Sequence, residues 1–115
     1  MNENVILEKS KRLAVRIVKL YKHLNEEKQE YVLSKQVLRS GTSIGATVRE
    51  AVQGQSRRDF LFKMSIALKE AAETEYWLEL LMETGYLTQK EFESIYKDVG
   101  ENARRLTSIV KTLRN

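Results

Sequence analysis

Hydrophobic residues recur at intervals of three and four along four segments of the chain, a period that places them on one face of an α-helix. In the first two segments this face holds Ile6, Leu13, Ile17, Leu20 and Leu24, then Val37, Gly41, Ile44, Val48 and Ala51. In the last two it holds Phe60, Met64, Ala67, Ala71, Leu78 and Leu81, then Phe92, Ile95, Val99, Leu106, Ile109 and Leu113. The pattern predicts helices over approximately residues 4–24, 30–53, 57–84 and 89–113.

The breaks between these segments are short and carry helix-capping residues. A polar stretch over residues 23–29 separates the first two helices. Gly54 precedes Ser56, which can cap the third helix, and Gly85 precedes Thr88 and Glu91, which have the spacing of a capping box. Short turns between long amphipathic helices predict an all-α fold, an antiparallel up-and-down four-helix bundle formed by residues 1–115 as a single domain.

Composition narrows the class of protein further. The 115 residues suffice for one domain, and 42% hydrophobic with 31% charged residues is ordinary for a globular protein. Cysteine is absent, which excludes disulfides and thiolate metal sites. No apolar run approaches the ~20 residues of a membrane span, so we expect no membrane partner. Residues 1–6 lack a basic-then-apolar leader, so we expect a cytoplasmic protein.

The third helix carries apolar residues outside its core stripe, and these are candidates for an interface between copies of the chain. They are Leu61, Leu68, Tyr76, Trp77 and Leu80. Alternatively, Trp77 and its neighbours cover an end of the core. The second helix is rich in small residues over residues 40–47, which predicts a close helix crossing because small side chains let backbones approach.

Several short motifs resemble a family of small bacterial four-helix bundle proteins. The resemblance runs from about Leu13 to Leu87 and rests on Arg39-Ser40, Ser43-Ile44-Gly45-Ala46, Glu50, Ser56, Asp59-Phe60 and Ile66-Ala67. Some members are encoded within intervening sequences of large-subunit ribosomal RNA genes, and another is the accessory variability protein of diversity-generating retroelements. This chain has Thr47-Val48-Arg49-Glu50-Ala51 where the family often has Asn-Ile-x-Glu-Gly.

The resemblance implies a ring-like homopentamer with a basic surface. For the retroelement member it also implies binding to nucleic acid and to a reverse transcriptase. These expectations concern assembly and partners, and the residues themselves must show whether this chain carries a suitable surface.

The net charge of +4 is unevenly distributed. Residues 1–25 carry six basic against two acidic residues, whereas residues 56–86 carry four against six. Spacings of three and four place Lys9, Arg12, Arg16 and Lys19 along one side of the first helix, where they could follow phosphates without reading sequence. Further candidates for contact with RNA or DNA are Arg104, Arg105 and Lys111 near the end of the chain, and Arg57 and Arg58 at a helix start, which alternatively form a solvated loop.

Catalytic chemistry is not evident in the sequence. His23 is the only histidine and lies near the end of a helix, where it complements the helix dipole. Ser40 and Ser43 have no histidine in their segment to activate them, and no cofactor or metal site is expected. We expect Arg39 to form a structural ion pair with an acid such as Glu50 or Glu70.

Two functional hypotheses remain open besides an enzyme, for which the sequence offers no catalytic constellation. The first is a homo-oligomeric scaffold that binds nucleic acid, or a protein associated with nucleic acid, through its basic surfaces. The second is a protein–protein adaptor whose positive charge is incidental. The salt dependence of binding separates them, because phosphate contacts release counterions.

Overall fold

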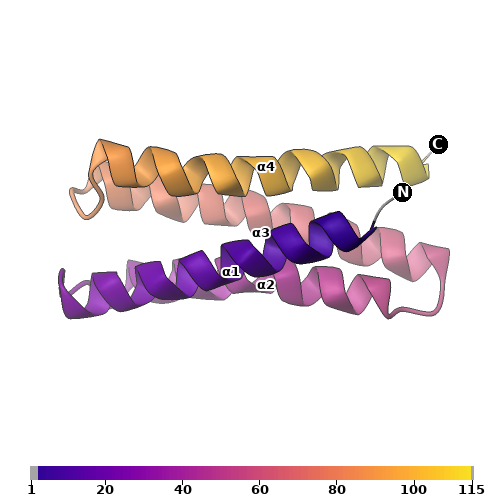
Figure 1. Ribbon diagram of the computed structural model, residues 1–115, viewed down its shortest axis with the longest axis horizontal. Coiled ribbons are helices and arrows are strands. Elements are labelled where there is room, and N and C mark those ends of the chain that lie inside the picture. The colour runs from indigo at the N-terminus through magenta and orange to yellow at the C-terminus, as the bar shows by residue number, and fades with distance from the viewer. Residues whose placement is uncertain (1–2, 115) are drawn as a thin grey trace.

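The computed structural model describes residues 3–114, which form an up-and-down four-helix bundle (Figure 1). Its helices are α1 (Glu3–Glu26), α2 (Leu33–Val52), α3 (Arg57–Glu83) and α4 (Gln89–Arg114). The described part of the chain is an elongated body with principal extents of 44 × 20 × 19 Å. The α1–α2 and α3–α4 loops lie at one end, and the α2–α3 loop lies at the other end with both termini.

The expected core stripes form the core of the bundle. Most of the stripe residues are buried, and four of them, Leu20, Phe60, Phe92 and Leu113, are half-buried at its margin. Consecutive helices pack closely, whereas α1 and α4 touch only lightly. The fully buried polar side chains of Ser10, Ser34, Ser40 and Thr74 donate hydrogen bonds or accept them, so these groups stay satisfied in the core.

Local signals place three of the helix ends as expected. The Ser56 side chain accepts a hydrogen bond from the Asp59 backbone N–H at 3.0 Å. Thr88 and Glu91 form a reciprocal capping box, with N···O distances of 2.8 and 3.1 Å. Gly85 adopts a φ of 89° after α3, a conformation in which a glycine costs least.

The start of the second helix differs from the expected residue 30, because α2 begins at Leu33. Gln29 adopts a left-handed φ of 52°. The Glu30 carboxylate then accepts hydrogen bonds from the backbone N–H groups of Val32, Leu33 and Ser34. Glu30 therefore caps the helix from outside, since a carboxylate near the first turn satisfies its free N–H groups and its dipole.

The predicted close crossing is between α2 and α1. A Cβ atom built on Gly41 would lie 2.7 Å from Cγ1 of Ile17, which is fully buried. A Cβ atom on Gly45 would lie 3.1 Å from the backbone oxygen of Ser10. The small residues of α2 thus let the two backbones approach, as the sequence pattern predicts.

Candidate nucleic-acid interface

An open groove runs between α1 and α4, the first and last helices of the bundle. Three pockets lie along it: one of about 550 Å³ near the α1–α2 and α3–α4 loops, one of about 280 Å³ in the middle and one of about 740 Å³ toward the termini. Neighbouring pockets share lining residues, Arg16 and Ser94 at one junction and Lys9 and Glu101 at the other. The three pockets therefore form one continuous surface, the α1–α4 groove.

Positive charge is concentrated in this groove. Its pockets are lined by eight basic and three acidic side chains, which gives a net charge of +5. Because the whole chain has a net charge of +4, all other residues together carry −1. The basic residues are Lys9, Arg12, Arg16, Lys19, Lys90, Lys97, Arg104 and Arg105, and the acidic ones are Glu91, Asp98 and Glu101.

Two of the basic residues connect the helices across the groove. Arg16 of α1 donates to the Ser94 hydroxyl at 2.9 Å and lies 3.3 Å from a carboxylate oxygen of Asp98 on α4. Lys9 lies 3.7 Å from a carboxylate oxygen of Glu101. These partly exposed pairs contribute little stability, but they hold Arg16 and Lys9 at defined places between the helices.

The other basic residues of the groove form no ion pair within residues 3–114, although Arg104 lies close enough to Glu75 to oppose the rise in the pKa of that carboxyl group that burial causes. These residues are Arg12, Lys19, Lys90, Lys97, Arg104 and Arg105. Sequence reasoning missed Lys90 and Lys97, although a signal for them exists. Basic residues recur every seven positions along α4, at 90, 97, 104 and 111, which keeps them near one face because a helix drifts only ~20° per seven residues.

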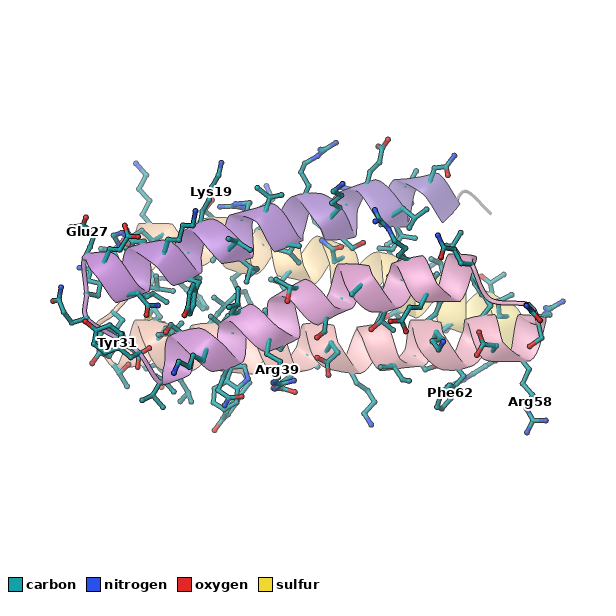
Figure 2. All side chains as sticks on the ribbon, turned by 90° about the horizontal axis from the view of Figure 1, so that it is seen from below. Lys19, Glu27, Tyr31, Arg39, Arg58 and Phe62 are labelled. Atoms are coloured by element: carbon teal, nitrogen blue, oxygen red, sulfur yellow. The ribbon has the colours of Figure 1, made fainter. Side chains whose placement is uncertain are left out.

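The remaining basic candidates lie outside the groove. Figure 2 shows Lys19 projecting from α1 and Arg58 projecting from α3 on opposite sides of the bundle. Arg57 lines a different pocket, beside Leu113 and the α2–α3 loop. Lys111 is exposed in the last turn of α4, where a cation complements the helix dipole. The fold therefore gathers the row on α1 with Arg104 and Arg105, and it separates Arg57 and Arg58 from them.

Known proteins resemble the chain over nearly its whole length. A family model described as 23S rRNA-intervening sequence protein matches residues 2–108. The chain belongs to this family. It is also similar to a crystal structure of a protein with unknown function from the S23 ribosomal protein family of Bacteroides thetaiotaomicron, with 59% identity and a TM-score of 0.94. That match covers 96% of this chain and 99% of the other, whereas no curated protein matches.

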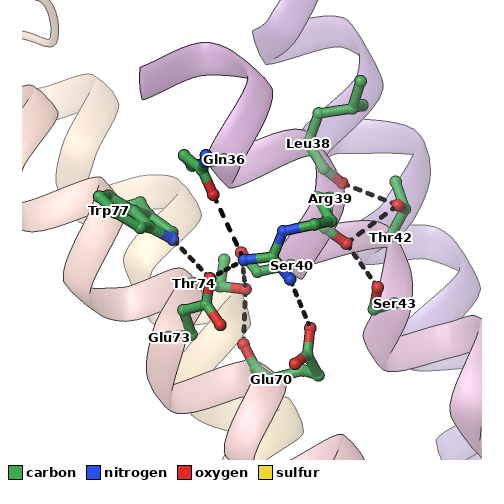
Figure 3. A network of polar contacts seen from close by, with 10 residues as sticks. All are labelled: Gln36, Leu38, Arg39, Ser40, Thr42, Ser43, Glu70, Glu73, Thr74 and Trp77. Atoms are coloured by element: carbon green, nitrogen blue, oxygen red, sulfur yellow. Dashed lines mark hydrogen bonds and ion pairs between the residues drawn. The ribbon is translucent and has the colours of Figure 1, made fainter. Parts of the chain in front are cut away.

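Family membership confirms the resemblance seen between Arg39 and Phe60, and the structure shows that part of this stretch stabilises the helix packing (Figure 3). Arg39 of α2 lies 3.6 Å from a Glu70 carboxylate oxygen and also pairs with Glu73 on α3. The Trp77 indole N–H donates to Glu73 at 2.8 Å. This network holds α2 and α3 in register.

The alternative partner proposed for Arg39 was wrong. Glu50 instead lies 3.8 Å from the Lys63 ammonium group. Arg39 and Glu50 are both on α2 and are separated by roughly 16 Å at about 1.5 Å per residue, so they cannot pair within one chain.

The candidate interface residues on α3 divide between core and surface. Leu61, Leu68 and Trp77 are half-buried and pack against the core within the chain. Leu80 is half-buried, and Tyr76 is 54% exposed. Phe62, which sequence reasoning missed, is 62% exposed and projects away from the bundle (Figure 2). The exposed apolar face of α3 is therefore formed by Phe62 and Tyr76.

The carboxylates between α3 and α4 form a separate cluster. The Tyr96 hydroxyl donates to Glu79 at 2.7 Å, and this hydrogen bond together with burial raises the pKa of Tyr96 to about 12. Burial and the neighbouring charge of Glu79 raise the pKa of Glu75, which Arg104 opposes. Glu75 and Glu79 thus lie on the side of α3 that faces α4.

Within residues 3–114, no group of three or more His, Cys, Asp and Glu side chains could hold a metal ion. None of the helices described in the structure combines the length and hydrophobicity needed to cross a membrane. Ser40 accepts from Thr74 and so links α2 to α3, whereas the Ser43 hydroxyl donates to the Arg39 backbone carbonyl within α2.

Proposed function

We propose that this protein is a non-enzymatic, homo-oligomeric helical scaffold of the cytoplasm that binds nucleic acid through the α1–α4 groove. The observation that carries the proposal is the charge of the groove, which exceeds the net charge of the whole chain. Incidental positive charge would be spread over the surface, whereas a row of cations along a groove attracts a polyanion. The family description, which refers to 23S rRNA, supports RNA as the first nucleic acid to test.

The dimensions of the groove agree with a phosphate-backbone ligand. Its α4 side runs from residue 90 to residue 112, which is roughly 33 Å at about 1.5 Å per residue. One turn of duplex DNA has a similar length of about 34–36 Å. Lysine and arginine side chains that meet phosphates fix position without specifying sequence, so we expect binding to be largely non-specific.

The salt dependence of binding tests this function. We expect the protein to bind a labelled structured RNA and a DNA duplex at about 50 mM salt, and to lose roughly 10³–10⁵ in affinity at about 200 mM if six to ten phosphates are contacted. Fluorescence anisotropy on both ligands gives the two affinities. Absence of binding at 50 mM salt would reject the proposal and favour the adaptor.

Self-association is supported by two exposed apolar faces on different helices. Val15 and Val18 are exposed on α1, and Phe62 and Tyr76 are exposed on α3. Within the described residues α1 and α3 do not pack against each other, so the two faces belong to opposite corners of the bundle. Two unlike faces suit head-to-tail association. Such an assembly closes into a ring when the rotation between neighbouring copies is a whole fraction of a full turn. The ring-like homopentamer implied by the family resemblance is such an assembly.

Light scattering at micromolar concentration tests the assembly. We expect a mass near five times 13.4 kDa for the unaltered protein. Phe62→Glu should lower the mass because a carboxylate at an apolar interface is costly to desolvate. Thr112→Glu, at an exposed position on α4, is the matched control and should leave the mass unchanged. A mass near 13.4 kDa for the unaltered protein would show that it is a monomer.

The adaptor remains the second candidate function, and the exposed aromatic side chains favour it. Tyr31 in the α1–α2 loop is 52% exposed and Phe62 is 62% exposed, and aromatic residues are enriched at protein interfaces. An adaptor would bind its partner through apolar contacts, whose affinity changes little between 50 and 200 mM salt. The salt experiment therefore separates the two functions.

A further inference from the structure

The end of the α1–α4 groove near the α1–α2 and α3–α4 loops differs in chemistry from the rest. Its pocket of about 550 Å³ has an apolar floor formed by Leu20, Leu87 and Ile95. Leu87 and Ile95 are each only 5% exposed. Apart from Ile109, the other two pockets of the groove are lined by charged and polar side chains, so the pocket near the loops differs in having three apolar side chains. A phosphate backbone can interact with the charged and polar side chains of those pockets, but it makes no favourable contact with an apolar floor.

Basic side chains surround this apolar floor. Lys19 of α1 and Lys90 of α4 are exposed and line the pocket from its two sides, and Arg16 lines it where it joins the middle of the groove. Arg16 is held in place by Ser94 and Asp98, so its planar guanidinium group is oriented before any ligand arrives. A pocket of this size, apolar inside and with a few convergent polar groups, is typical of a small-ligand site.

We propose that this pocket receives the base of one unpaired nucleotide, while the adjoining phosphate lies against Lys19, Lys90 and Arg16. The proposal rests on the proposed function, since the nucleotide belongs to a nucleic acid bound along the α1–α4 groove. A base in a duplex cannot enter, because its faces are stacked and its phosphates point outward. An unpaired base offers both an apolar face for the floor and an anionic group for the basic rim.

His23 supplies a further recognition element in the same pocket. Its Nε2 atom is buried and has no hydrogen-bond partner among residues 3–114. A buried polar atom without a partner is costly, and a base edge, which carries suitable donors and acceptors, reaches this atom when the imidazole ring turns toward the groove. The imidazole ring and the Arg16 guanidinium are also planar groups of the kind on which unpaired bases stack.

Glu91 adds a preference for bases that present N–H groups. One of its carboxylate oxygens accepts the backbone N–H of Thr88 at 2.8 Å. This hydrogen bond lowers the pKa of Glu91, which keeps the side chain ionised and able only to accept hydrogen bonds. An ionised carboxylate repels phosphate, so the base, not the phosphate, is the part of the nucleotide that we expect beside Glu91.

The single histidine makes the occupant directly observable by NMR, because the imidazole ring signals can come from His23 alone. The full chain is titrated with guanosine 5′-monophosphate and uridine 5′-monophosphate, and in parallel with ribose 5-phosphate and inorganic phosphate. We expect the two nucleotides to shift the His23 ring signals and the two base-free anions to shift them much less. Equal shifts from ribose 5-phosphate would identify a simple anion site and overturn the proposal.

A second measurement separates this proposal from the proposed function. A blunt RNA duplex and the same duplex with one unpaired 3′ nucleotide are compared at about 50 mM salt. We expect the overhang to tighten binding by roughly tenfold or more, as base stacking does in single-strand complexes. His23→Ala should remove this gain, measured as the ratio of the affinities for the two duplexes, and the exposed neighbour Lys22→Ala should leave the ratio intact.

The outcomes are distinct for the two ideas. If the blunt duplex binds but the overhang adds nothing, the groove binds nucleic acid and the base pocket is wrong. If neither RNA binds and the nucleotides leave the His23 signals unchanged, both the proposed function and the base pocket are rejected.

Discussion

Replacing Arg12, Lys19, Lys90 and Lys97 together by alanine is expected to weaken RNA binding by ~10²-fold or more at about 50 mM salt. All four side chains line the α1–α4 groove, and within residues 3–114 none of them forms an ion pair that the substitution would break. Each phosphate contact removed should also lower the slope of log affinity against log salt by about 1. Fluorescence anisotropy across a salt series measures both quantities.

A charge-matched variant makes this test specific to the groove. Lys11, Lys22, Lys35 and Lys69 are exposed elsewhere on the bundle, and replacing all four by alanine lowers the net charge by the same amount. This control should retain most of the affinity and most of the salt slope. If the two quadruple variants lose affinity equally, the net charge alone attracts RNA and the groove is not the binding surface.

Replacing Gly41 by leucine is expected to destabilise the bundle by roughly 1–3 kcal/mol, because the new side chain enters the space of a fully buried residue. The first added atom already lies 2.7 Å from Cγ1 of Ile17. Ile17→Ala alone should cost about 2–5 kcal/mol by leaving a cavity. The double variant should lose less free energy of unfolding than the two single losses added together, by more than ~1 kcal/mol. Each change relieves the defect that the other creates.

Urea unfolding at a fixed protein concentration measures these differences in the free energy of unfolding. Gly100→Leu is the matched control, because a Cβ atom on Gly100 meets only the flexible end of Arg104, at 3.3 Å. This variant should keep or slightly increase stability through its higher helix propensity. Additive losses in the Gly41 and Ile17 double variant would show that the two positions do not share one space.

The groove variant and the Gly41 and Ile17 variants affect different sides of α1. The residues that pack α1 on α2 lie on the core side of the helix, around Ile17. The residues that face the groove, such as Arg12 and Lys19, occupy the other side and are exposed. Binding and stability should therefore respond independently to the groove and crossing variants, provided that the groove variant remains folded by circular dichroism.

Much of the fold follows from the sequence because the deciding signals are local or periodic. The spacing of Ile6, Leu13, Ile17 and their equivalents defines one face of each helix, and the structure buries those faces. Ser56, Gly85 and the Thr88–Glu91 box act within a few residues of the helix ends that they cap or terminate. The α2 start was misplaced because Glu30 caps through a longer side chain than the usual capping residues.

The candidate site could be predicted only in part. The row of cations on α1 was visible from spacings of three and four, since these repeat along one helix. That this row lies beside Lys90 and Lys97 was not visible from the sequence, because Arg16 and its partner Asp98 are 82 positions apart. The exposure of Phe62 was also hidden, since α3 is apolar on several faces and the sequence does not tell which face lacks a neighbour.

The sequence by itself thus determined that the chain forms four amphipathic helices, how α3 and α4 are capped, and which stripe of each helix enters the core, because helical periodicity and capping act over a few residues. Only the tertiary structure decided that α1 and α4 lie side by side with a groove between them, which gathers eight basic side chains from both ends of the chain. It also decided that Arg39 meets Glu70 and Glu73. Periodicity fixes an angle around one helix axis, whereas the partner across a groove depends on how all four helices pack.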